Sequence, residues 1–159
     1  MRRLKRLVRD EDAAELVEFA LSASILFMLI FGIIEFCMLI YSGSFVAFAA
    51  QQGARYAMVR GSDWASPCST TLTAGCQAAQ GDVQSYVLSL SHPGINLTTS
   101  NIKAVPLYTT AAGLSCAAKP YAQGCEIQVT VTYSFGLNIP FIPAATIPLS
   151  SSSIETIQD

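Results

Sequence analysis

Three carboxylates lie in or beside an apolar stretch near the N-terminus. Residues 12–36 have the sequence DAAELVEFALSASILFMLIFGIIEF, with Glu15 and Glu18 at its start and Glu35 well inside it. A charged side chain in a membrane segment costs at least about 2.5 kcal/mol, so it persists where a partner or a polar path compensates for that cost. Glu15 and Glu18 share one helical face and can lie among the lipid headgroups. Glu35 is an intramembrane polar position that either snorkels to the outer boundary or faces a partner helix.

The stretch that carries these carboxylates is predicted to form one long apolar helix. Between residues 19 and 50 only Glu35 is charged, and no proline occurs before Pro67. We therefore expect an unbroken helix over about 12–59, roughly 70 Å long and about twice as long as a hydrocarbon core is thick. Half of this helix must stand outside the membrane. Cleavage of a secretory signal after Ala49 is an alternative, but a signal has an apolar core of only about 7–15 residues.

A basic leader precedes the apolar stretch. The chain is 52% hydrophobic and only 13% charged, which is unusual for a soluble domain. By the positive-inside rule the leader places the N-terminus in the cytoplasm and the chain after about Gly53 outside. A nucleic-acid-binding tail is the competing interpretation, but the net charge of -2 gives it no support, and we expect no nucleic-acid partner. The basic residues of the leader are Arg2, Arg3, Lys5, Arg6 and Arg9.

The outer half of the expected helix has the composition of a packing surface. The segment YSGSFVAFAAQQGARYAMVRG combines small residues with apolar bulk at helical spacings. Small residues allow helices to approach closely, whether the neighbour belongs to the same chain or to another one. The segment therefore packs either on the chain's own outer domain or on sibling subunits, and the pattern does not choose between them.

The remaining chain indicates an α+β domain of about 100 residues. Apolar residues at i, i+3, i+4 and i+7 over 83–90 predict an amphipathic helix that ends near SHPG. Strict alternation over 127–135 predicts a half-buried strand. Segments 95–108 and 145–158 are further strand candidates, the second of them edge-like, and the prolines at 140, 143 and 148 predict an extended loop before it. The expected fold is a long transmembrane helix extending into a small domain with an antiparallel sheet.

Four of the five cysteines fall in the expected outer domain. An even number in an oxidising compartment predicts disulfides, and Cys37 in the apolar helix is expected to pack there. We favour the local set, Cys68 with Cys76 and Cys116 with Cys125, because each pair closes a loop that contains glycine. The other two connectivities remain possible. A zinc site is the rival, but the spacings lack CxxC.

Catalytic motifs are missing from the sequence. The single histidine, His92, lies in the turn-like SHPG, and we find no serine elbow, phosphate loop or HExxH. We therefore predict that the protein is not an enzyme and uses no cofactor and no metal.

The N-terminal blocks resemble a known family. The sequence AAELVEFALSASILFMLIFGIIEF followed by AAQQGARYAMVRG is similar to the TadE-like proteins, pseudopilins of the tight-adherence (Flp) pilus system. The resemblance is close over residues 1–61, and it rests on the EFAL and GARYA blocks at this spacing. Two positions depart from the family pattern: Ala13 stands where glycine is usual, and Ser24 stands where a helix-kinking proline is common.

The resemblance implies maturation by a membrane prepilin peptidase on the cytoplasmic face. The family's cleavage position corresponds to the bond between Ala13 and Ala14, ahead of Glu18 and Phe19. Glu18 would then pair with the new N-terminal ammonium of a neighbouring subunit during assembly. This divides the chain into a cytoplasmic leader (1–13), a transmembrane and extended helix (14–60) and an extracytoplasmic domain (61–159).

Two hypotheses about function follow. In the first, the chain is a single-pass protein of the bacterial inner membrane, a TadE-like minor pilin or pseudopilin that acts in type IVb (Flp/Tad) pilus assembly for adhesion or secretion. Its partners would be other pilins, Tad inner-membrane assembly proteins, the prepilin peptidase and the lipid bilayer. In the second, it is a membrane-anchored outer domain that binds a ligand, without leader processing.

Overall fold

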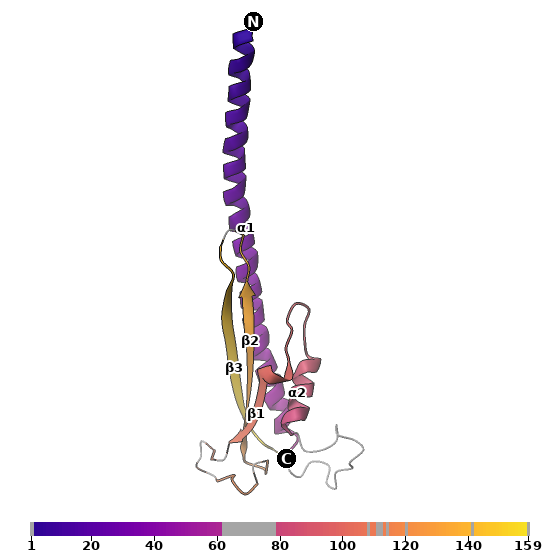
Figure 1. Ribbon diagram of the computed structural model, residues 1–159. Helices are drawn as coiled ribbons and strands as arrows, with labels where there is room; N and C mark the ends of the chain where they lie inside the picture. Colours follow the sequence, from indigo (N-terminus) through magenta and orange to yellow (C-terminus); the bar gives the residue numbers. More distant parts are fainter. Residues whose placement is uncertain are drawn as a thin grey trace. The chain divides into compact units, whose positions relative to one another are not determined.

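The computed structural model describes residues 2–61, 79–107, 109–110, 113, 115–119, 121–140 and 142–158, with side chains from Ala13 onward. Its elements, in chain order, are a long helix, a short helix, one 3-10 turn and three strands (Figure 1). The α+β class predicted from the sequence is therefore confirmed, and so is the long N-terminal apolar helix that precedes a small antiparallel sheet.

The long helix α1 spans Arg2–Met58. Its C-terminal end agrees with the prediction to within one residue, whereas its N-terminal end lies earlier, because the basic leader is helical as well. No proline occurs in this range, so no missing backbone N–H interrupts the helix before Met58.

The second helix, α2, spans Gln80–Ser89 and ends just before SHPG, as predicted. The Asp82 carboxylate accepts the backbone N–H of Ala79 at 3.2 Å and so satisfies one free donor at the helix start. The Gln84 side-chain amide donates to the carbonyl oxygens of Thr99, at 3.1 Å, and Ile102, at 2.9 Å. These bonds tie α2 to the segment that leads into the sheet.

The sheet has three strands in the order β1-β2-β3. Strand β1 (Ile102–Leu107) pairs antiparallel with β2 (Glu126–Leu137), and β3 (Ala145–Thr156) returns on the other side of β2. The third strand is an edge strand, as predicted, and an edge tolerates a proline inside the strand such as Pro148.

Strand β1 begins later than the sequence predicted. The candidate segment started at Ile95, but residues Thr99–Asn101 form a 3-10 turn, η2, ahead of the strand. The Asn101 side-chain oxygen accepts the backbone N–H of Thr98 at 2.9 Å, a local bond that competes with strand pairing.

One hydrophobic core joins the outer part of α1 to α2 and the sheet. On β2 the side chains of Ile127, Val129 and Val131 are buried, which confirms the alternation seen in the sequence. From α1 the core takes one face of mostly small residues, so the helix packs on the chain's own domain, one of the two possibilities left open above. The buried residues of this face are Phe45, Val46, Ala49, Ala50, Ala54 and Ala57.

The chain forms two compact units. One comprises Met1–Leu39 together with Gly136–Thr146, which is the tip of the β2–β3 hairpin. The other comprises Ile40–Phe135 with Ile147–Asp159, and it holds the hydrophobic core.

Gly53 lies where α1 approaches the core most closely. A Cβ atom at this position would meet a methyl carbon of Val87 at 2.9 Å and one of Val129 at 3.0 Å. Both valines are fully buried, so neither can move away without disturbing the core. By contrast, nothing lies within 4 Å of a Cβ atom added at Gly43.

We predict that Gly53→Ala destabilises the protein relative to Gly43→Ala. Both changes gain the same helix propensity, up to about 1 kcal/mol, so their difference isolates the steric cost. Overpacking of a core costs roughly 1–3 kcal/mol. Thermal unfolding of the two variants in the same detergent measures this difference, and identical melting temperatures would contradict the close approach at Gly53.

A disulfide joins Cys116 to Cys125, with the sulfur atoms 2.10 Å and the Cα atoms 5.9 Å apart. Both residues are buried, and the second closes a turn in which its N–H donates to Ala122. Cys37 carries a free, exposed thiol. The proposed partners Cys68 and Cys76 lie outside the described residues.

For the cysteines, we predict that non-reducing peptide mapping of the protein from its native compartment recovers the Cys116–Cys125 and Cys68–Cys76 peptides. Only Cys37 should then react with a thiol reagent after unfolding in detergent. A bond from Cys68 to Cys116 or Cys125 would reject the local pairing.

Replacing Cys116 and Cys125 together with alanine should lower the free energy of unfolding by about 2–4 kcal/mol, because the bridge restricts the unfolded chain.

Candidate membrane helix and its carboxylates

The first part of α1 exposes apolar side chains on every side. Within the described residues, one helix is long and apolar enough to cross a membrane, and it covers Ala13–Met58. Large side chains along its first half are 40–72% exposed, with Phe19 at the top of this range. Water is a poor solvent for such a surface, whereas lipid chains or other apolar helices suit it.

Hydroxyl groups in this helix satisfy their own hydrogen bonds. Ser24 donates to the carbonyl of Ala20 at 2.7 Å, and Ser44 donates to the carbonyl of Ile40 at 3.0 Å. Each bond spans four residues and removes a free donor from the helix surface. The serine that stands in the usual position of the family's proline therefore leaves the helix unbroken.

The predicted cleavage position lies within continuous helix. Ala13 and Ala14 are exposed and belong to α1, which begins eleven residues earlier at Arg2. A peptidase binds its substrate backbone in an extended form, so cleavage here requires local unwinding of the first turns. Two alanines have no side-chain bulk to hinder that access.

The Glu18 carboxylate has no partner within the described part of the chain. Glu15, Glu18 and the neighbouring Phe19 are all exposed. Among the described side chains, none forms a hydrogen bond or an ion pair with Glu18. A charge in an apolar surface needs compensation, which another molecule or the headgroup zone must supply here.

Glu35 differs from Glu18 in its surroundings. It is half-buried, while the adjacent Ile34 and Phe36 are 52% and 60% exposed. Leu39, four residues further along the same face, is half-buried as well. Glu35 lies seventeen residues after Glu18, about 26 Å along the helix axis.

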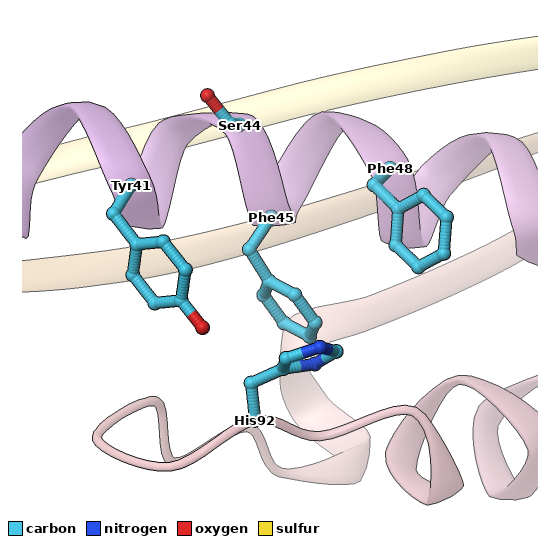
Figure 2. A pocket seen from close by; sticks show the side chains of 5 residues that line it. All are labelled: Tyr41, Ser44, Phe45, Phe48 and His92. Atoms are coloured by element: carbon cyan, nitrogen blue, oxygen red, sulfur yellow. The ribbon is translucent and has the colours of Figure 1, made fainter.

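An apolar groove beside α1 was missed by the sequence analysis (Figure 2). It has a volume of about 290 Å³ and is lined by Tyr41, Ser44, Phe45, Phe48 and His92. The His92 ring packs on Phe45, with centroids 5.1 Å apart, and its Nδ1 lies 2.7 Å from the Leu90 carbonyl oxygen. The aromatic spacing at 41, 45 and 48 was visible in the sequence, but the contact with His92 is tertiary.

A second aromatic cluster closes the other end of the helix. The rings of Tyr56 and Tyr86 stack with centroids 4.3 Å apart, and the Arg60 guanidinium lies 4.1 Å from the centre of the Tyr56 ring. These contacts fasten α2 to α1 through Tyr56, the tyrosine of the GARYA block, so that this residue has a structural role here. In the described part of the chain, no group of three or more metal-ligating side chains is present.

Comparisons with known proteins agree with the N-terminal resemblance. The searches of curated proteins and of solved structures returned no match. The scan against family models matched residues 14–55 to the family described as TadE-like protein. The matched residues hold Glu18, Glu35 and the small-residue face of α1, and they begin at Ala14, directly after the predicted cleavage position. The predicted resemblance to the TadE-like family is thus confirmed over residues 14–55.

Proposed function

We propose that the chain is a TadE-like minor pilin or pseudopilin that acts in assembly of a type IVb (Flp/Tad) pilus, for adhesion or secretion. The observation that carries this proposal is the exposed apolar half of α1 within the family-matched segment. Membership in a pilus-associated family supports pilins and assembly proteins as partners, and an exposed apolar helix is a suitable surface for them.

In this proposal α1 anchors the chain in the inner membrane. The basic leader stays in the cytoplasm, and the unit that holds the hydrophobic core lies outside. A disulfide between Cys116 and Cys125 supports an extracytoplasmic location of that unit, because disulfides persist in oxidising compartments.

Assembly in this proposal begins with cleavage between Ala13 and Ala14. The new ammonium group then needs an anionic partner once it is buried among apolar helices. Glu18 lies about one helical turn away and has no partner among the described side chains, so on a neighbouring subunit it can supply that charge.

A second candidate function is supported by the groove at Phe45 and His92. A membrane-anchored outer domain could bind an apolar ligand there, since ligand sites are concave and mostly apolar. Such an anchor has no need of leader processing, which separates the two proposals.

We expect the cognate prepilin peptidase, coexpressed with the protein, to remove residues 1–13. Sequencing of the mature N-terminus should then begin AELVEF. A chain that retains its original N-terminus in cells making functional pili would reject processing and favour the anchored ligand-binding domain. A peptidase with its catalytic aspartates replaced is the control.

A further prediction concerns the charge of Glu18. Glu18→Gln keeps the size of the side chain and removes the charge, so the variant should insert and be processed, yet fail to associate with partner pilins. Breaking a buried ion pair costs roughly 3–5 kcal/mol, because the other charge is left uncompensated. Glu15→Gln is the matched control and should be much milder. Crosslinking to partner pilins in intact cells measures the effect, and equal yields from Glu18→Gln and wild type would exclude the pairing role.

A further inference from the structure

The tip of the β2–β3 hairpin belongs with the apolar half of α1. We define the hairpin tip by residues 136–140 and 142–146, and Gly136–Thr146 forms one compact unit with Met1–Leu39. In that unit the helix side chains Glu35 and Leu39 are half-buried, although Ile34 and Phe36 beside them stay exposed. Among the described residues, the hairpin tip is the one segment of this unit besides the helix, so we assign the cover of this face to the tip.

The position of Glu35 sets the level of the tip in a membrane. Glu35 follows an uncharged stretch that begins at Phe19, and sixteen residues of helix span about 24 Å. A hydrocarbon core is about 30 Å thick, so Glu35 lies close to its outer boundary. A tip packed beside Glu35 lies at the same boundary.

The composition of the hairpin suits that environment. No charged residue occurs over 127–154, and the tip contains Leu137, Ile139 and Ile142. The Ile142 side chain is apolar and is 42% exposed. Placing this surface in lipid removes apolar area from water without burying any charge.

The backbone of the tip suits it as well. Pro140 and Pro143 have no N–H group, and the N–H of Ile142 donates to the carbonyl of Ile139 at 3.2 Å. Free backbone donors are what exclude irregular chain from the hydrocarbon region. Pro140, Ile142 and Pro143 therefore present no free backbone N–H, which suits a shallow position in the interface.

From these observations we propose that the hairpin tip lies in the outer interfacial layer of the bilayer and forms a second membrane contact next to α1. This inference rests on the proposed insertion of α1. Lipid is the occupant that the structure favours, because the bilayer that surrounds the exposed helix at Glu35 continues onto the tip beside it.

The test uses a single tryptophan as a probe in the full chain. Trp64 is the only native tryptophan, so Trp64→Phe provides the background. Ile142→Trp, and separately Ala144→Trp, place the probe in the tip. Ile154→Trp is the matched control, since Ile154 is an isoleucine of comparable exposure, 51%, on the same sheet. Leu29→Trp reports on the apolar helix itself.

The proteins are reconstituted at low density in phosphatidylcholine and phosphatidylglycerol vesicles with brominated acyl chains, which quench tryptophan fluorescence on contact.

We expect tryptophan at position 142 or 144 to lose most of its emission to lipids brominated near the headgroup, and less to lipids brominated deep in the chain. Tryptophan at 154 should keep its emission, and tryptophan at 29 should lose it to the deep label. Quenching at 29 without quenching at 142 and 144 would overturn the inference and leave the proposed insertion intact. An unquenched probe at 29 would overturn both. A response at 142 that appears only at high protein density would assign the tip to a second copy and overturn the lipid contact.

Discussion

The close approach of α1 to two buried valines at Gly53 is the contact on which the outer domain depends. Val87 comes from α2 and Val129 from the central strand, so one helical turn receives side chains from both of the elements that surround it. Alanines at 50, 54 and 57 lie on the same face, and their small side chains let the neighbouring elements approach the helix closely. A larger side chain at any of these positions would push the helix away, and the interior is too densely packed to absorb the displacement.

The two halves of α1 differ because they meet different surroundings. In its first half, large apolar side chains point outward on all sides, as lipid permits. In its second half, one small-residue face is buried and the exposed side carries Gln51 and Arg55. The end of the chain completes this half, because the N–H of Gln158 donates to the carbonyl of Met58 at 3.1 Å. That bond satisfies one of the acceptors left free where the helix ends.

Periodic patterns predicted the elements, but not the features that depend on how elements meet. The alternation over 127–135 and the helical spacing over 83–90 report burial directly, so both were found. The start of β1 was missed because a side-chain bond between Asn101 and Thr98 outweighs strand propensity there. The groove at His92 and the grouping of the hairpin tip with the helix arise from contacts between segments that lie far apart in the sequence. Local residue patterns do not predict such contacts.

The two carboxylates of the apolar stretch together restrict how α1 can lie in a membrane. The sixteen uncharged residues between Glu18 and Glu35 span about 24 Å, a little less than the thickness of a hydrocarbon core. A vertical shift of one turn would draw one of the two charges inward, at a cost of a few kcal/mol. In the proposed insertion, these two charges therefore limit how far α1 can slide along its axis. In the proposed insertion, the same constraint keeps Glu18 near the inner boundary of the hydrocarbon core, where a neighbouring chain can reach it.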